Sequence, residues 1–368
     1  MRRGMVALLF VLALVAGAGR VAAQATSSVA AGVEFERYSF EKPEVLDIES
    51  LTLLTMPFGA RVDLTRRITF SVTGAWARAT LVNSDGGSTD LSELTDTEAR
   101  LEFALVPGSV VLSAVGLLPT GSSALTFEEM IVAGAIAADQ LPFRVTHWGT
   151  GGGAGASLAL SRGFGDWSAG ASVGYVVGRT FEPLEGDAFE YRPGNQLQAI
   201  AAIDRLLGSR TKAALQVKYQ NFGADQGDGS NLFQTGDRLT AVGSLDFPIG
   251  QSSAIVYAGW YERDTAELFD PEPEVFPSQT MIYAGAGLRT ALGSAVLQPS
   301  IDVRSVDTDA GPGWTMGVGA QLEAPAGTAM LIPTARFRLG SAESVDGVKT
   351  GLTGVDVGFS VRFGAGQR

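Results

Sequence analysis

Apolar and polar residues alternate with a period of two along most of this chain. In the segment 350–363, every second position from Val355 to Phe363 is valine or phenylalanine, and polar or small residues such as Asp356 and Arg362 stand between them. Such alternation predicts strands with one apolar and one polar face. About sixteen segments show it, with fourteen as the alternative count, because boundaries taken from sequence are uncertain by about two to four residues. The predicted strands are 28–41, 50–62, 66–82, 92–106, 110–118, 152–162, 166–179, 195–206, 211–222, 236–247, 253–264, 279–291, 295–305, 313–324, 329–341 and 350–363.

The predicted strands are long, and two kinds of connection alternate between them. Most have about ten residues or more, whereas strands of soluble proteins typically have about five or six and a tilted strand needs about 9 to 11 to cross a bilayer. Short turns containing glycine, proline or aspartate alternate with the longer loops 42–50, 83–91, 119–151, 180–194, 223–235, 265–278, 306–312 and 342–349. This layout predicts an all-β, antiparallel, up-and-down transmembrane β-barrel with short periplasmic turns and long external loops. Aromatic residues near strand ends are expected to form its interfacial girdles: Phe58, Trp76, Trp167, Tyr219, Phe222, Tyr257, Tyr261, Trp314 and Phe363.

The N-terminal segment and the composition are consistent with an exported membrane protein. Residues 1–23 have a basic start, an apolar run and small residues before a cleavage point, and therefore predict a secretory signal peptide. Cleavage is expected after Ala23, with Ala25 as the alternative, which leaves 24–368 as a single barrel domain. Cleavage removes three arginines and takes the formal net charge from −12 to −15. Such acidity argues against a nucleic-acid partner, and the absence of cysteine excludes disulfides and thiolate metal sites.

One segment departs from the strand pattern. Residues 125–140, LTFEEMIVAGAIAADQ, predict a short helix within the longest loop, 119–151. Thr126 is a suitable N-cap, and Glu129 three residues later completes a capping box. Pro142 follows the expected end of the helix. An apolar stripe that could lie on a barrel wall is expected from Phe127, Met130, Ile131 and Gly134.

The long strands, the alternating turns and loops, and the final segment VGFSVRF resemble the general diffusion porins. The resemblance covers the mature chain and implies a homotrimer in the outer membrane, in contact with its lipid. It also implies that the third external loop, 119–151, folds toward the lumen and narrows or plugs it; a helix lying outside the barrel is the alternative. Phe359 and Phe363 would be the signal that the barrel-assembly machinery reads, although GAGQR follows Phe363 here.

A constriction of this kind is expected to carry two opposed sets of charges. If the loop lies inside, it presents Glu128, Glu129 and Asp139 to the lumen. The wall is expected to oppose them with basic side chains: Arg78, Arg100, Lys218, Arg304, Arg336, Arg338 and Arg362. Rings of charge at a narrow point select ions and orient dipolar solutes. The leading functional prediction is therefore a porin-like channel for passive diffusion of small hydrophilic solutes or ions.

Other functions have weaker signals. His147 is the only histidine, and no recognisable nucleophile motif accompanies it, so we expect no enzyme and no catalytic residue. The segment 225–231, DQGDGSN, is interpreted as a turn, and neither a metal nor another cofactor is expected. Residues 117–126, LLPTGSSALT, resemble the long-chain fatty acid transporters, which makes a transporter of hydrophobic compounds the first alternative. A barrel enzyme or an adhesin is the second.

Overall fold

The computed structural model describes residues 27–269, 272–308, 311–344 and 346–365. The predicted signal peptide therefore lies outside the described residues. The strands of the main sheet are β1 (Ser27–Phe40), β2 (Ser50–Asp63), β3 (Ile68–Val82), β4 (Ser88–Leu94), β5 (Thr97–Val106), β6 (Val110–Leu118), β7 (Gly153–Phe164), β8 (Trp167–Gly178), β10 (Gln196–Leu207), β11 (Thr211–Phe222), β14 (Arg238–Ile249), β15 (Ser252–Arg263), β18 (Gln279–Leu292), β19 (Ala295–Thr308), β20 (Gly311–Ala326), β21 (Ala329–Glu343) and β22 (Lys349–Ala365).

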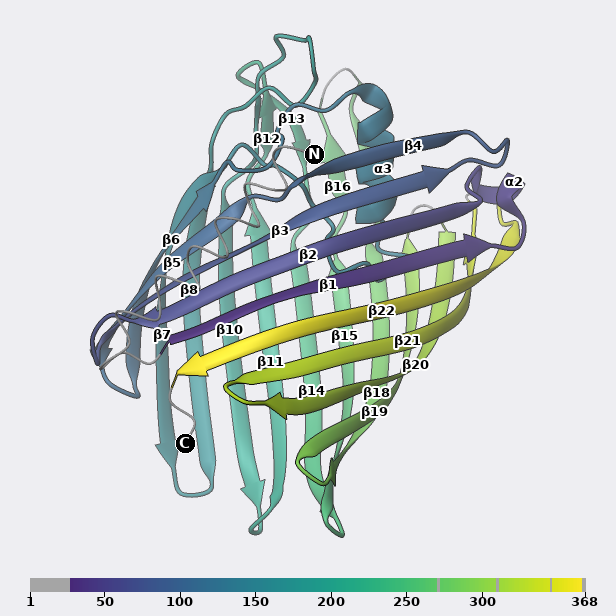
Figure 1. The fold of residues 1–368 in the computed structure, drawn as a ribbon. Helices are drawn as coiled ribbons and strands as arrows, with labels where there is room; N and C mark the ends of the chain where they lie inside the picture. The colour runs from purple at the N-terminus through teal and green to yellow at the C-terminus, as the bar shows by residue number, and fades with distance from the viewer. Residues whose placement is uncertain (1–26, 270–271, 309–310, 345, 366–368) are drawn as a thin grey trace.

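These strands close into an antiparallel barrel (Figure 1). Apart from β4, which pairs with β3, each described strand pairs with its two neighbours in the wall, and β1 pairs with both β2 and β22, which joins the two ends of the sheet. β4 and β5 pair with successive parts of β3 and together form one interrupted wall strand. The 17 strands of the sheet therefore make a 16-stranded barrel. The predicted fold class and the preferred strand count are confirmed.

Short turns close one rim of the barrel, and their backbone explains their composition. Gly250 and Gly293 have φ values of 60° and 61°, in the left-handed region that a side chain disfavours. Gly250 lies in the turn between β14 and β15, and Gly293 lies in the turn between β18 and β19. The opposite rim carries the long connections, as the sequence predicts.

The two faces of the wall differ in chemistry. Glu36 on β1 lies opposite Leu53 on β2 and Asp356 on β22, so these three side chains share the inner face. The alternate residues point outward and are apolar: Val33, Phe35, Val357 and Phe359 are 39–49% exposed. A continuous exposed apolar surface of this kind is suited to the hydrocarbon of a bilayer.

The same register corrects three of the predicted girdle residues. Tyr257 lies opposite Ser244 and Gly285, and Gly285 lies opposite the inward-facing Asp302. Tyr257 therefore points into the barrel. Tyr261, four residues further along β15, and Phe222, four residues after the inward-facing Lys218 on β11, take the same face. They occupy inner positions because strand alternation, rather than residue type, decides which face a side chain takes.

Three external loops form a second sheet that the sequence does not reveal. It contains β9 (Tyr191–Arg192), β12 (Asp225–Gly227), β13 (Ser230–Gln234), β16 (Ala266–Leu268) and β17 (Glu274–Phe276). Tyr191 donates its hydroxyl to Asp225, and burial together with this hydrogen bond raises the pKa of Tyr191 above its ordinary value. These strands have two to five residues, too few for alternation to be visible.

Two helices occur within the described residues, α2 (Pro43–Leu46) and α3 (Phe127–Ala137). Neither is long and apolar enough to cross a membrane. α2 lies in the connection between β1 and β2. α3 belongs to the connection between β6 and β7, residues 119–152, which we call the inner loop.

Candidate functional site

The helix of the inner loop forms where its cap predicts. The Thr126 hydroxyl accepts a hydrogen bond from the Glu129 amide at 3.3 Å, and the Glu129 carboxylate accepts one from the Thr126 amide at 2.9 Å. This reciprocal pair is the predicted capping box. The helix begins at Phe127 and ends at Ala137, three residues before the predicted end.

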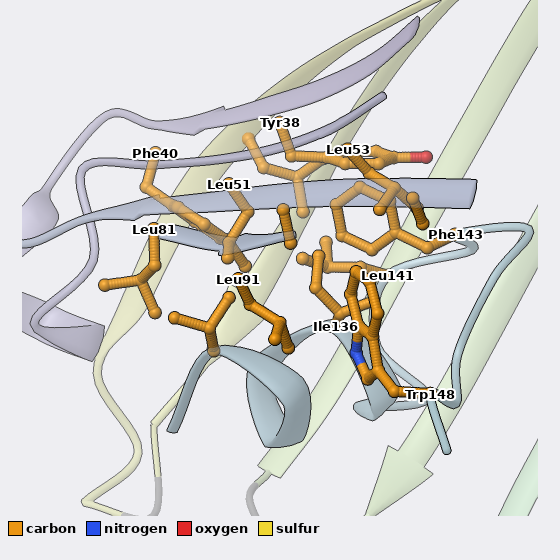
Figure 2. Close-up of a cluster of buried hydrophobic side chains, with 14 of the residues drawn as sticks. Tyr38, Phe40, Leu51, Leu53, Leu81, Leu91, Ile136, Leu141, Phe143 and Trp148 are labelled. Atoms are coloured by element: carbon orange, nitrogen blue, oxygen red, sulfur yellow. The ribbon is translucent and has the colours of Figure 1, made fainter. Parts of the chain in front are cut away.

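α3 lies inside the barrel, against the inner face of the first strands (Figure 2). Val132 and Ile136 are fully buried. They pack into an apolar cluster that combines wall residues with the chain after the helix. Its other members are Tyr38, Phe40, Leu51, Leu53, Ala77, Ala79, Leu81, Leu91, Leu141, Phe143, Trp148, Ala342 and Leu352. The predicted location of the loop, folded toward the lumen, is confirmed.

The predicted apolar stripe of the helix is wrong. Phe127 is 70% exposed and Ile131 is 52% exposed, and no atom comes within 4 Å of a Cβ built on Gly134. The helix instead turns Val132 and Ile136 to the wall because this face is continuous with Leu141, Phe143 and Trp148 after the helix. The combined set buries more apolar surface than the stripe alone could.

Beyond the helix, the inner loop contacts the wall at β18 and β19. The Asp139 carboxylate accepts a hydrogen bond from the Gln279 side chain at 2.8 Å, and the Asp139 carbonyl accepts one from Arg304. Gln140 donates to the Thr308 hydroxyl at 3.2 Å. Asp139 and Arg304 are thus one predicted acidic and one predicted basic residue that the fold brings together.

A second contact has the opposite polarity. Arg144 of the inner loop pairs with Glu34 on β1, and its other terminal nitrogen lies 3.7 Å from the Asp356 carboxylate on β22. The Arg144 amide also donates to the Glu36 carboxylate at 3.3 Å. Glu36 and Asp356 are only 2% and 5% exposed. The loop therefore supplies a cation to an acidic part of the wall, which the sequence analysis did not foresee.

Two of the predicted wall arginines are held by the wall itself. Asp302 on β19 pairs with Arg336, and it accepts from Arg338 at 3.0 Å. Arg336 also donates to the Ser300 hydroxyl at 3.1 Å. All three charged groups point inward, because Asp302 lies opposite Gly317 and Gly317 lies opposite Arg338. The glycines opposite these arginines leave room for the guanidinium groups.

The remaining predicted basic residues are spread around the barrel. Arg100 faces the lumen and pairs with Glu98 at 2.9 Å. Lys218 and Arg362 also face the lumen. Arg78 does not: it lies opposite Leu54 and Ser92, on the outer face, and pairs with Asp90 at 2.9 Å. Its neighbours Ala77 and Ala79 hold the inner positions, so the prediction that Arg78 belongs to the lumen wall is corrected.

The three predicted acidic residues of the loop also have different environments. Glu129 is used in the cap, and Glu128 is exposed in the first turn of the helix. Asp139 alone of the three contacts a predicted basic wall residue. Phe359 and Phe363 lie on the outer face of β22, each 42% exposed; their role in barrel insertion stays a prediction.

A cavity of about 430 Å³ adjoins Arg144 on the inner side of strands β14 to β22. Charged and hydrogen-bonding side chains line it, among them Arg144, Asp246, Arg289, Arg336 and Asp356. Among the described residues, no group of three or more histidine, aspartate and glutamate side chains is arranged to hold a metal ion. The lining of the space thus combines charged groups of both signs with small and apolar side chains.

Several of these residues escaped the sequence analysis. Glu34, Glu36, Asp302 and Asp356 stand at polar positions of alternating strands, so their inward direction was available from the pattern. Their mutual proximity was not, because it depends on the register between strands distant in the chain. Arg144 lies outside any strand, and no pattern indicated its partner.

No protein-family model matches this sequence, and no curated protein matches it. Among solved structures, it is similar to a loop deletion mutant of OmpT, an outer membrane protein of Vibrio cholerae, with 11% identity over 92% of this chain and 99% of that one, and a TM-score of 0.42. It is also similar to a mutant of the Rh. blastica porin, with 14% identity over the same shares and a TM-score of 0.39. Likenesses this distant leave the function to the geometry of the chain itself.

The chain is an outer-membrane β-barrel. Among the described strands, each wall strand except β4 pairs on both edges, the outer face is apolar, and the inner face is charged, which is the arrangement that allows strands to span a bilayer. Its architecture resembles that of the porins at the level predicted: sixteen strands and a long loop folded inside.

Replacing Arg144 by glutamine should shift ion selectivity toward cations. Glu34 and Asp356 would lose their cation, and one unit charge about 4 Å from an ion in water changes its energy by about 1 kcal/mol. We expect the cation-to-anion permeability ratio to rise about fivefold, measured as the reversal potential in a potassium chloride gradient. Arg205→Gln is the control, because Arg205 lies on the outer face over Trp167. Equal ratios in both variants would contradict the prediction.

Proposed function

We propose that the barrel is a porin-like channel through which small hydrophilic solutes or ions diffuse passively across the outer membrane. The observation that carries this proposal is the inner loop itself. It crosses a charged lumen and is held at defined points by Gln279 and Arg304 on one part of the wall and by Glu34 and Glu36 on another. A loop fixed in this way narrows a passage to a definite size and lines it with fixed charges, which is how selectivity arises in a pore.

The charges support a transverse arrangement that differs from the predicted one. Asp139 faces the basic side of the wall, and Arg144 faces the acidic side. Both signs therefore occur on the loop and on the wall. The net charge of the chain does not by itself set the preferred ion, and selectivity depends on the level at which each pair stands along the pore.

The test is single-channel current of the refolded mature protein in a planar bilayer, with the reversal potential taken in a salt gradient. Steady ohmic conductance is the expected result. Absence of conductance from protein that is folded and inserted, as judged by circular dichroism and resistance to heat unfolding in detergent, would overturn the proposal. The homotrimer implied by the porin resemblance stays a prediction, and chemical cross-linking of the same preparation measures it.

A second candidate is a transporter of hydrophobic compounds. The observation that favours it is the exposed apolar face of α3, formed by Phe127, Met130 and Ile131, which points away from the inner wall that buries Val132 and Ile136. An apolar surface inside a barrel could bind an alkyl chain. Saturable binding of a fatty acid that is lost in Ile131→Asp, combined with no ionic conductance, would favour this candidate over the channel.

A further inference from the structure

The external end of the lumen carries three basic side chains: Lys218 on β11, Arg238 on β14 and Arg263 on β15. Arg238 at the start of β14 lies directly opposite Arg263 at the end of β15. Lys218 on β11 lies opposite Thr240, the next inward position after Arg238. All three share the inner face with Tyr261, which lies opposite Thr240. They stand beneath the loops that carry β12, β13, β16 and β17.

This cluster is unusual because its charges are not neutralised within the described residues. Like charges directly opposite each other destabilise a strand pair. Yet no described carboxylate lies within salt-bridge distance of Lys218, Arg238 or Arg263, whereas Arg100, Arg144, Arg336 and Arg338 each have such a partner. The Nε atoms of Arg238 and Arg263 are buried and have no hydrogen-bond partner. Buried polar groups are normally paired, so both guanidinium groups carry a hydrogen-bond donor without a described acceptor.

Three described carboxylates of these strands and of the inner loop have other partners or lie on the other face. Asp237 accepts hydrogen bonds from Tyr219 and from Asn221, the latter at 2.9 Å. Asp139 of the inner loop accepts a hydrogen bond at 2.8 Å from Gln279, which lies directly opposite Arg263. Glu262 lies opposite Leu239, on the outer face. None of these carboxylates lies within salt-bridge distance of the three cations.

One of the guanidinium groups is also held in place. The guanidinium carbon of Arg238 lies 4.9 Å from the centroid of the Phe222 ring, which points inward from β11. Stacking on an aromatic ring orients the planar group without using its donors. The cluster therefore combines three cations, one of them oriented by an aromatic ring, which suits an anion with several oxygen atoms.

We propose that Lys218, Arg238 and Arg263 form a binding site for small oxyanions, phosphate or carboxylate, in the external vestibule of the channel. The site would concentrate such solutes beside the inner loop before they pass it. This proposal rests on the proposed channel function for its biological meaning, but binding itself does not require conduction. It is separate from Arg304, Arg336 and Arg338, whose partners are Asp139 and Asp302.

The test is isothermal titration of inorganic phosphate into the refolded protein in detergent, with acetate and chloride as parallel titrants at constant ionic strength. We expect the unaltered protein to bind phosphate or acetate in preference to chloride. Arg238→Gln with Arg263→Gln should weaken oxyanion binding about tenfold or more, since hydrogen bonds to charged groups are the strong ones. Lys212→Gln is the matched control. It removes a lumen-facing lysine on β11, the strand of Lys218, and this lysine already pairs with Asp204.

Equal oxyanion affinity in the double variant and the control would overturn the proposal, as would binding of chloride equal to that of phosphate. If the double variant does not fold, Lys218→Gln alone takes its place, with a weaker but measurable loss expected. Phosphate should also reduce single-channel current from the external side in the unaltered protein and not in the variant. Loss of conduction with binding intact would overturn the channel function alone, and conduction without oxyanion binding would overturn this site alone.

Discussion

Replacing Ile136 by aspartate is expected to release α3 from the inner wall of the barrel. Ile136 is fully buried between wall residues such as Leu53 and Leu91 and the chain after the helix. Truncating a buried isoleucine to alanine alone costs about 2–5 kcal/mol. Aspartate adds the desolvation of a carboxylate, which costs several kcal/mol more when no partner is present. The docked state of the inner loop should therefore cease to be the dominant one.

Two measurements follow the release. The inner loop should become a cleavage site in limited proteolysis while the barrel stays resistant, and the single-channel current should become larger and noisier because the constriction is no longer fixed. Ile131→Asp is the control on the same helix, since Ile131 is 52% exposed and its replacement leaves the docked face intact. Unchanged proteolysis and a quiet channel in Ile136→Asp would show that the apolar cluster does not hold the loop.

Replacing Asp302 by asparagine is expected to leave two arginines uncompensated in the wall. Asp302 is the carboxylate that pairs with both Arg336 and Arg338, and the side chains of Asp302 and Arg338 are only 15% and 11% exposed. Removing one partner of a buried ion pair costs about 3–5 kcal/mol. The barrel should unfold at a lower denaturant concentration. The lumen also loses a negative charge, so selectivity should move toward anions, opposite in sign to the effect of Arg144→Gln.

Denaturant unfolding followed by tryptophan fluorescence, together with the reversal potential, measures both effects. The control is Asp204→Asn, which breaks the more exposed pair with Lys212; exposed pairs contribute about 0–1 kcal/mol. If the two variants unfold alike and Asp302→Asn keeps the selectivity of the unaltered protein, Asp302 does not organise the two arginines.

Much of the architecture was predictable from local pattern. Alternation indicated the wall strands, because a strand with a bilayer on one side and water on the other must alternate in polarity at every second residue. The break between β4 and β5 was not predicted, and neither were the short strands of the external loops, because two to five residues show no period. The helix was predicted because Thr126 and Glu129 satisfy backbone groups locally.

The charge pairs were predicted only in part. Position in the alternation is sufficient to place Arg336, Arg338 and Arg304 on the inner face. It is also sufficient to place Arg78 on the outer face, next to the inward-facing Ala77 and Ala79; the prediction erred by weighing its charge above its register. Which carboxylate meets which arginine depends on how many residues each strand is shifted against the next, and a shift of one residue reverses the face of every side chain.

The sequence by itself determined the barrel, its two faces, the alternation of turns and loops, and the existence of one capped helix, because each depends on interactions between residues close in the chain. Only the tertiary structure decided which face of α3 is buried, that Arg144 meets Glu34 and Asp356, and that Arg238 and Arg263 stand opposite each other without a described acid. These contacts join residues brought together by closure of the sheet, and the free energy of burying apolar surface against a distant strand outweighs the local preference of any one segment.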